Sequence, residues 1–351
     1  MVKNARRIIK YQIILMIIAL VLGIFFCNIT ADLLSKPAGK LMKIATGGGL
    51  KSLKIDNSEI PKIFYPRLRK SVYFPMYIAT RALSISRKVQ GEKNRGENLK
   101  YFLNHVNWLR DNLRLSTHDD VKYGVWEHNF RYPYGIYELE VPWRSGMSQG
   151  FGISALNKAY EITGDVSYLE HAKYALNAFF IDVKNGGVTY KDSKNDWWFE
   201  EYAGALDGVE PRVLNGAIYA VIDIYEFWKT TGDQNAQTLF VKGVNGIKNR
   251  LEQYDTGRWT YYDAIGTIAT KHYHGDHIYL TQKLYEITGE KIFLEYNKKW
   301  SQYKIPYFIR EFLIQKPDYH DIVILGLNVF GVLILEYFFV GLFFFLKRHR
   351  L

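Results

Sequence analysis

Two long apolar runs lie close to the ends of this 351-residue chain. The first covers residues 13–27 and follows four basic residues, and the second covers residues 322–346 and precedes a basic tail. About 20 apolar residues suffice to cross a bilayer, so both runs predict transmembrane helices. Because basic residues flank both runs on their outer sides, we expect both termini in the cytoplasm and the residues between the runs outside it.

The second run carries polar side chains at membrane depth. Glu336 stands near its middle, eight residues or about two helical turns after Asn328. A carboxyl group at that depth is costly unless it is protonated or paired. Two interpretations stay open: Glu336 contacts a membrane partner, such as a glycan export or polymerising protein, or it is a neutral side chain tolerated in a single span.

Between the two runs, apolar residues at helical spacing stand on both sides of a repeated Gly-acidic pair. The pair occurs at Gly164, Gly232 and Gly289, with a looser copy at Gly91, so successive glycines are 73, 68 and 57 residues apart. Glycine favours the left-handed conformation that ends a helix, and the next acidic residue can cap the following helix. Four such pairs predict an array of α/α hairpins.

The longer links between these hairpins have a different pattern. Residues 137–141 alternate apolar and polar side chains, and residues 186–190 also look like a short strand. We therefore expect short β-hairpin insertions between the helix pairs, and loops between rigid helices are a common place for functional residues.

These patterns divide the chain into five parts. We predict a cytoplasmic tail and N-terminal membrane anchor (residues 1–34), a linker (35–60), a mainly α folded domain (61–310), a second transmembrane helix (322–346) and a cytoplasmic basic tail (347–351). The sequence after Cys27 is a poor cleavage site, which favours an uncleaved anchor over a removed signal peptide.

Composition narrows the class of protein. The single cysteine excludes an intrachain disulfide scaffold. Residues 35–320 hold 39 Lys and Arg against 32 Asp and Glu, a net charge of +7, which favours an anionic partner such as an acidic polysaccharide or a membrane surface. We expect no nucleic-acid partner, because no nucleic-acid-binding motif is present and the block is predicted to lie outside the cell.

Aromatic and acidic residues cluster in the segment Trp197–Tyr202, which reads Trp-Trp-Phe-Glu-Glu-Tyr. A carboxylate beside a tyrosine, framed by tryptophans, suits a site that holds a sugar and moves a proton, since aromatic faces cover the C–H patches of a pyranose. Carboxylates and phenols exchange protons with carbon only when buried and paired, because their ordinary pKa values are poorly matched to that task.

Five motifs in order resemble the C-terminal catalytic domain of the D-glucuronyl C5-epimerase family. The resemblance covers roughly residues 70–305, and it implies an α/α barrel-like toroid that inverts C5 of uronic acid units in a polysaccharide. We expect the reaction to need no cofactor. The motifs are Trp143–Gly150, Asp196–Tyr202, Val213–Tyr219, Tyr254–Gly257 and Tyr273–Ile278.

Inversion at C5 needs one group to remove a proton and another to return one to the opposite face. The resemblance implies that Glu201, Tyr202, Tyr262 and Tyr273 are catalytic. We expect Tyr202 and Tyr273 to face each other across the ring, with Glu201 as a second base or as the group that polarises a phenol, and Tyr262 as a binding group. For substrate binding we predict nine further residues: Trp143, Arg144, Gln149, Trp197, Trp198, Arg212, Asn215, His274 and His277.

The chain departs from the family's eukaryotic members in three ways. Ile265 stands where they have a basic residue, their large β-rich regions before the domain are missing, and the second membrane span is extra. These differences leave the identity of the polymer open, beyond its being an anionic uronate-containing polysaccharide.

Other functions remain open at this stage. A uronate lyase shares the C5 proton removal, and a glycoside hydrolase needs two facing carboxylates, which Glu201 with Glu127, Asp196 or Asp263 could supply. A third possibility is a non-catalytic glycan-binding subunit of an export assembly. A metal site is not expected, because the spacing of His272, His274 and His277 fits no standard zinc pattern.

Overall fold

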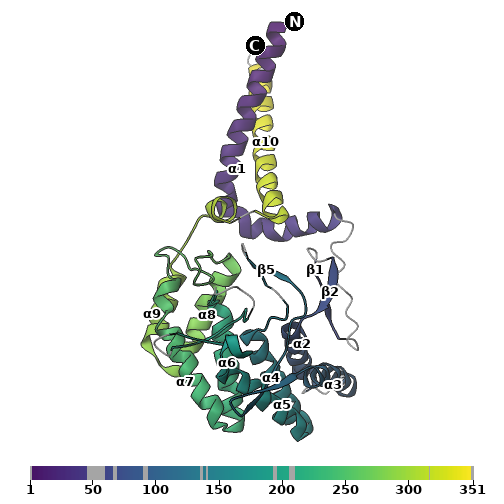
Figure 1. Cartoon of the computed structure of the whole chain (residues 1–351). Coiled ribbons are helices and arrows are strands. Elements are labelled where there is room, and N and C mark those ends of the chain that lie inside the picture. The colour runs from purple at the N-terminus through teal and green to yellow at the C-terminus, as the bar shows by residue number, and fades with distance from the viewer. Residues whose placement is uncertain are drawn as a thin grey trace. The chain divides into compact units, whose positions relative to one another are not determined.

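A computed structural model of the chain describes residues 2–45, 60–65, 69–89, 94–134, 137–139, 141–192, 196–204, 210–315 and 317–348 (Figure 1). The chain forms two compact units, one from Met1–Lys54 with Lys304–Leu351 and the other from Ile55–Tyr303. The loose repeat at Gly91 and residues 46–59 of the expected linker lie outside the described residues.

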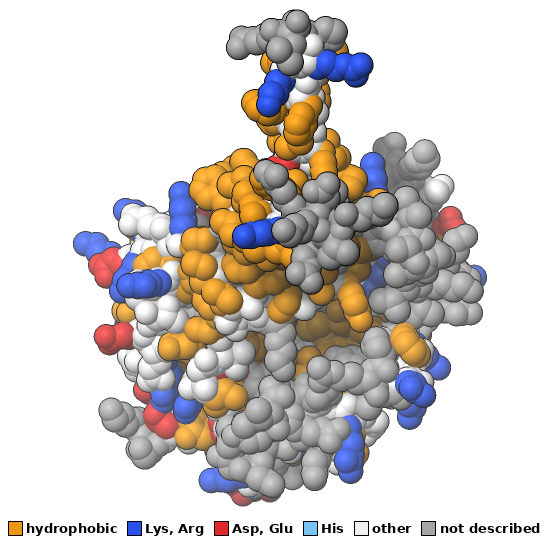
Figure 2. Space-filling model, turned by 90° about the horizontal axis from the view of Figure 1, so that it is seen from above, with side chains coloured by type: hydrophobic (Ala, Val, Ile, Leu, Met, Phe, Trp, Pro, Cys, Tyr) orange, Lys and Arg blue, Asp and Glu red, His pale blue; other side chains and the backbone are white. Residues whose placement is uncertain are grey.

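The first unit is built on two long helices, α1 (Val2–Ala45) and α10 (Tyr319–Arg348), which pack against each other. A π-helix, η5 (Ile309–Ile314), precedes α10. Both long helices are apolar and long enough to cross a membrane. Hydrophobic side chains crowd the surface of this helix pair, with Lys or Arg side chains close to its tip (Figure 2).

Polar and small residues join the two helices. The Thr30 hydroxyl donates to Asn328 Oδ1 at 2.8 Å, and the helices approach so closely that a Cβ on Gly23 would lie 2.6 Å from Val329 Cγ2. Small residues that let backbones approach are typical of helix contacts in membranes. Asn328 thus has a partner within the unit, whereas the buried Glu336 carboxylate oxygens have no hydrogen-bond partner among the described residues.

The described residues of the second unit form four helical hairpins. The first helix of each hairpin contacts the first helix of the next, and these first helices form the curved inner row of the array: α2, α4, α6 and α8. The predicted α/α hairpin toroid is thus confirmed. The hairpins are α2 (Pro75–Val89) with α3 (Arg95–Asp111), α4 (Gly146–Thr163) with α5 (Val166–Asn177), α6 (Leu214–Thr231) with α7 (Gln234–Lys248), and α8 (Lys271–Thr288) with α9 (Lys291–Ser301).

The predicted Gly-acidic pairs end the inner helices. Gly164, Gly232 and Gly289 have φ values of 73°, 69° and 71°, in the left-handed region. Asp233 then caps α7 by accepting from the backbone N–H groups of the second and third residues. Glu290 precedes α9 without a side-chain cap and pairs with Lys248 at 3.1 Å instead, because its longer side chain does not fold back as Asp does.

In the part of the chain that the structure describes, four antiparallel two-stranded hairpins are inserted between the helices, as the alternating patterns predicted. Short single-turn helices fill other links. The strands are β1 (Lys62–Tyr65), β2 (Lys70–Tyr73), β3 (Arg114–His118), β4 (Val121–Val125), β5 (Tyr132–Tyr134), β6 (Tyr137–Leu139), β7 (Thr189–Lys191) and β8 (Trp197–Phe199), and the short helices are η2 (Ala178–Phe180), η3 (Val183–Asn185) and η4 (Leu251–Tyr254).

Aromatic side chains form much of the core of the second unit. The largest fully buried side chains are those of Trp126, Trp143, Trp198 and Trp300. The high aromatic content therefore serves packing as well as any sugar site, and only the positions of individual rings distinguish the two uses.

Candidate active site

A cavity of about 300 Å³ lies at the N-terminal ends of inner helices of the second unit. It is lined by one carboxylate, four tyrosines and a tryptophan, together with apolar side chains and one serine. The lining residues are Ile63, Phe64, Phe74, Met76, Tyr77, Tyr132, Trp143, Ser145, Glu201, Tyr202 and Tyr273.

Backbone hydrogen bonds bring the distant motifs together at this cavity. The backbone of Arg144 pairs with that of Ala203 in both directions, at 3.0 and 2.8 Å, so the Trp143 segment lies beside the Glu201–Tyr202 segment. The Leu214 N–H donates to the Tyr262 carbonyl at 3.1 Å, which joins the start of α6 to the segment that carries this predicted catalytic tyrosine.

Helix starts surround the cavity. Ser145 is the N-cap of α4, and its hydroxyl accepts from the Ser148 N–H at 3.1 Å. Tyr273 lies in the first turn of α8, and Met76 and Tyr77 lie in the first turn of α2. Because helix N-termini carry partial positive charge, this end of the array complements an anion even though no Lys or Arg is among the described residues that line the cavity.

Glu201 and three phenols form a connected series of groups. Glu201 accepts a hydrogen bond from Tyr202, and the Tyr202 and Tyr262 hydroxyls are 3.4 Å apart. The Tyr262 ring lies 4.5 Å from the Tyr273 ring, at an angle of 40°. The four predicted catalytic residues, from three separate segments of the chain, are thus adjacent in space, and Glu201, Tyr202 and Tyr273 line the same cavity.

Burial separates the pKa values of these groups. It raises the pKa of Glu201 to about 7, although the hydrogen bond from Tyr202 opposes this effect. Burial also raises the pKa of Tyr202 and of Tyr262 well above 10, and that of Tyr273 to about 12. At neutral pH the phenols are therefore protonated hydrogen donors, whereas the carboxyl group is close to half ionised.

The Glu201 side chain lies over the first turn of α6. A Cβ on Gly216 would lie 2.2 Å from Glu201 Oε2 and 2.7 Å from Glu201 Cβ. Only glycine leaves this space, so the Val213–Gly216 motif has a physical role in placing the carboxyl group.

Trp143 forms one wall of the cavity. Its ring stacks on His128 at 3.8 Å, and its indole N–H donates to the Phe130 carbonyl at 2.9 Å. Burial lowers the pKa of His128 to about 3, so this histidine is neutral and serves as a packing surface. The predicted role of Trp143 in substrate binding is compatible with this position.

Arg144 and Gln149 lie outside the set of cavity-lining residues. The Gln149 side chain accepts from the Trp126 N–H at 2.9 Å and donates to the Gly124 and Ala175 carbonyls, at 2.9 and 3.1 Å. An Arg144 guanidinium N–H donates to the Val183 carbonyl at 3.3 Å. Both side chains hold backbone segments in place, and their contact with substrate stays a prediction.

Trp197, Trp198 and Arg212 are likewise not among the described residues that line the cavity. Trp198 is buried and stacks on Tyr254 at 5.7 Å, while Trp197 lies 4.2 Å from the Lys191 ammonium group. The Arg212 N–H donates to Glu200 Oε2 at 3.1 Å. Asn215, also predicted to bind substrate, is buried in the first turn of α6, and its Oδ1 has no hydrogen-bond partner within the described chain.

His274 and His277 support the tyrosines. Each Nδ1 lies 3.0 Å from the Thr260 hydroxyl, and the His274 ring stacks on Trp259 at 3.6 Å. These contacts fix the segment that carries Tyr262 against the helix that carries Tyr273. These contacts suit a positioning role for both histidines, and their predicted contact with substrate stays a prediction.

Several cavity residues were not found from the sequence. Tyr132 stacks on Tyr202 at 5.5 Å, and Phe74 lies 5.9 Å from Trp143. The aromatic richness of residues 123–143 was a signal for Tyr132, but nothing local marked the start of α2. The missed lining residues are Ile63, Phe64, Phe74, Met76, Tyr77, Tyr132 and Ser145.

Comparison with known proteins decides the family. The family described as D-glucuronyl C5-epimerase C-terminus matches residues 119–302, more than half of the chain. The chain belongs to this family. The family region of the chain thus includes Trp143, Glu201, Tyr202, Tyr262 and Tyr273, and membership supports a carbohydrate epimerase as its broad class.

Two curated relatives each match about half of the chain. An uncharacterized protein of Methanocaldococcus jannaschii is 40% identical over 189 residues, which are 52% of this chain and 59% of the relative. The D-glucuronyl C5-epimerase of Caenorhabditis elegans is 34% identical over 180 residues, 46% of this chain and 29% of that protein. The chain thus spans about three fifths and less than a third of these relatives.

Among solved structures, the cellobiose 2-epimerase from Spirochaeta thermophila is similar with a TM-score of 0.49 and 12% identity, covering 91% of this chain and 86% of that one. The GH76 α-mannanase BT2949 of Bacteroides thetaiotaomicron gives 0.47 and 16%, covering 77% and 68%. Similarity at this level carries no argument about activity.

Proposed function

We propose that this epimerase-family chain is a membrane-anchored polysaccharide uronate C5-epimerase. The observation that carries the proposal is one cavity lined by Glu201, Tyr202 and Tyr273, with the Tyr262 hydroxyl 3.4 Å from the Tyr202 hydroxyl. Burial there raises the pKa of Glu201 to about 7 and keeps the phenols protonated. Family membership supports the same class of reaction.

In the proposed reaction, the Glu201 carboxylate takes the C5 proton of a uronic acid unit. The electron pair of the C–H bond moves into the adjacent substrate carboxylate and gives an enediolate. The Tyr273 phenol then donates its proton to the opposite face of C5, which becomes the inverted centre. The resulting phenolate regains a proton from Glu201 through Tyr262 and Tyr202, so no net proton is gained or lost.

The pKa values favour Glu201 over a tyrosine as the base. A general base works best with a pKa near the operating pH, and about 7 meets this condition. A phenolate base would need a nearby cation, and the described lining residues include no Lys or Arg. This assignment adopts the second-base role that the sequence left open for Glu201.

Hydrolysis is the less favoured alternative. It requires two facing carboxylates, and Glu201 is the single carboxylate among the described residues that line the cavity. Asp196 contacts Asn249 at 2.9 Å, Asp263 accepts from the Thr267 N–H, and Glu127 pairs with Arg114. None of these carboxylates lines the cavity.

The reaction class can be tested with polymer made in the presence of the wild-type chain, the Glu201→Gln variant or the Tyr202→Phe/Tyr273→Phe variant. We expect inverted uronate with wild type only, with unchanged polymer length and no ultraviolet-absorbing unsaturated ends. Unsaturated ends would indicate a lyase, and shortening would indicate a hydrolase. If the tyrosine variant left the uronate composition unchanged, a non-catalytic glycan-binding role would replace the proposal.

Membrane anchoring by α1 and α10 is part of the proposal. Their length and apolar surfaces support it, and the basic flanks support cytoplasmic termini with the catalytic domain outside. An external domain would meet an anionic polysaccharide during its synthesis or export, together with the proteins of that process. We expect the protein to stay in the membrane fraction after an alkaline wash. We also expect protease added outside intact cells to cleave the domain. Release of the protein by the wash would contradict anchoring.

A further inference from the structure

A second concavity, separate from the catalytic cavity, has no assigned role. It is a groove of about 540 Å³ in the same unit, and three cations and an aromatic pair contribute to its lining. These are Lys62 and Lys70 of the β1–β2 hairpin, Arg114 of β3, Tyr73, and Trp108 of α3. All five precede the region matched by the family, so the family assignment does not account for them.

The groove offers one apolar face and one charged edge. The Tyr73 and Trp108 rings lie 5.4 Å apart at 38°, and Tyr73 is 43% exposed. The Lys62 ammonium group lies 4.6 Å from the Tyr73 ring. Arg114 donates to Glu127 at 2.8 Å, so this carboxylate neutralises one cation and leaves the lysine edge positive.

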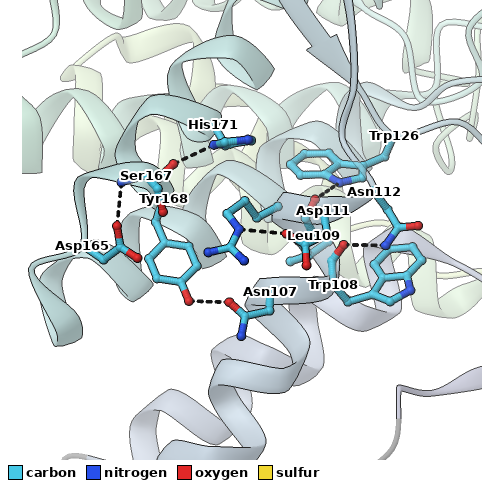
Figure 3. A network of polar contacts seen from close by, with 11 residues as sticks. Asn107, Trp108, Leu109, Asp111, Asn112, Trp126, Asp165, Ser167, Tyr168 and His171 are labelled. Carbon is cyan, nitrogen blue, oxygen red and sulfur yellow. Dashed lines mark hydrogen bonds and ion pairs between the residues drawn. The ribbon is translucent and has the colours of Figure 1, made fainter.

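The floor of the groove is held rigidly. The Trp126 indole N–H donates to the Leu109 carbonyl at 2.8 Å, and the Asn112 amide donates to the Trp108 carbonyl at 2.9 Å (Figure 3). The Tyr168 hydroxyl of α5 donates to Asn107 at 2.6 Å, which fixes the same end of α3 (Figure 3). A rigid platform lowers the conformational entropy lost when a ligand binds.

The groove adjoins the catalytic cavity. Phe130 lines the groove, and its ring lies 5.6 Å from Trp143, which lines the cavity. In β1, Lys62 lines the groove while its neighbours Ile63 and Phe64 line the cavity. A chain that enters the cavity therefore has a neighbouring surface within reach of its next units.

We propose that this groove is a polymer-binding subsite for the sugar units next to the reacting uronate. The sugar rings stack on Tyr73 and Trp108, and the carboxylates of the sugars pair with Lys62 and Lys70. Both chemistries fit an acidic polysaccharide, because pyranose rings offer apolar C–H faces and uronates offer negative charge. An anionic lipid surface would use the lysines but has no need of a concave aromatic platform. The inference rests on the proposed function for the identity of the polymer, and not for the existence of the groove.

The test compares a groove variant, Lys62→Ala/Lys70→Ala, with a control variant, Lys291→Ala/Lys298→Ala. The control replaces two exposed lysines on α9 and so changes the net charge by the same amount. Binding of the full-length chain is measured with short oligosaccharides and with long chains of heparosan and hyaluronan. For the polymer that binds, we expect the groove variant to bind long chains about tenfold more weakly at low salt, and the control to lose less than about twofold. Affinity for the short oligosaccharides should stay unchanged.

A second variant separates stacking from charge. Tyr73→Ala should weaken binding of long chains at high salt as well as at low salt, whereas the effect of the lysine variant should shrink as salt screens the ion pairs. Equal long-chain binding by both lysine variants would overturn the proposal. So would lysine-dependent binding to phosphatidylserine vesicles without lysine-dependent binding to any polymer.

The outcomes distinguish this inference from the proposed function. If wild type binds long polymer through Lys62 and Lys70 but gives no inverted uronate, the subsite stands and the epimerase proposal fails. If inversion occurs but long-chain binding is indifferent to these lysines, the epimerase proposal stands and the subsite fails.

Discussion

At the scale of single residues, burial raises the pKa values of both the carboxyl group and the phenols of the site, but it suits them to different tasks. Desolvation brings the pKa of Glu201 up to about 7, where a carboxylate is a better-matched base. The same effect moves Tyr202 and Tyr273 further from ionisation, which suits the proposed role of Tyr273 as proton donor and of Tyr202 in the proton relay. One physical cause thus separates the roles of base and acid.

The pH dependence of turnover follows from this separation. Because the ionised Glu201 carboxylate is the active form, kcat/KM for C5 exchange should rise as pH increases through about 7 and level off above it. Glu201→Gln should lose about 10²–10⁴-fold in rate. An exposed control, Glu286→Gln, should keep both the rate and the pH profile. If kcat/KM of the wild-type protein fell between about pH 6 and 8, around the pKa of Glu201, the assignment of Glu201 as the base would be contradicted.

Tyr273→Phe removes the proposed proton donor but keeps the ring. We expect about 10²–10⁴-fold lower kcat with little change in KM, because the phenol hydrogen matters mainly when charge develops at C5. Tyr285→Phe on the same helix is the matched control, and it should retain activity. A loss confined to KM would show that Tyr273 only binds substrate.

At the scale of secondary-structure elements, the inner helices begin at the cavity and the Gly-acidic pairs set where they end. The left-handed glycines and the Asp caps were predictable because they depend on neighbours in sequence. The contact between Gly216 and Glu201 joins α6 to a distant loop, so spacing alone did not reveal it.

Gly216→Ala tests this contact between elements. The added Cβ meets both the Glu201 carboxyl oxygen and its Cβ, so the carboxyl group must move. We expect a large loss of kcat with the fold retained, as measured by circular dichroism. Gly275→Ala on α8, where a Cβ meets nothing within 4 Å, should keep activity and gain up to about 1 kcal/mol of stability. Full activity of the Gly216 variant would contradict the proposed placement.

Asp233→Ala tests the caps. The loss of two hydrogen bonds at the start of α7 should reduce the free energy of unfolding by about 1 kcal/mol. This corresponds to a fall in Tm of about 2–4 °C for a unit of this size. Glu290→Ala, at the equivalent position of α9 but without a side-chain cap, should change Tm by less; equal losses would show that capping is not the cause.

At the scale of the whole molecule, the sequence predicted the helix pairs, the β-hairpin insertions and the two apolar helices. Periodicity and turn residues carry this information locally. It also identified Glu201, Tyr202, Tyr262 and Tyr273 as members of one site, through the family motifs.

The rest required tertiary structure. Motif membership marks a residue without saying whether it binds or packs: Gln149 directs its amide at backbone groups, and Trp198 stacks on Tyr254. Tyr77 reaches the cavity from the start of α2, far in sequence from the motifs, so no local pattern selects it.

The most direct test of the account is proton nuclear magnetic resonance of a glucuronate polymer after a single turnover in deuterated water, with the protein pre-equilibrated in that solvent. If Glu201 removes the proton and a solvent-exchanged phenol returns one to the other face, the newly inverted uronate carries deuterium at C5 from the first turnover. Inverted uronate that keeps its original hydrogen would mean that one group moves the proton both ways, and it would contradict the account.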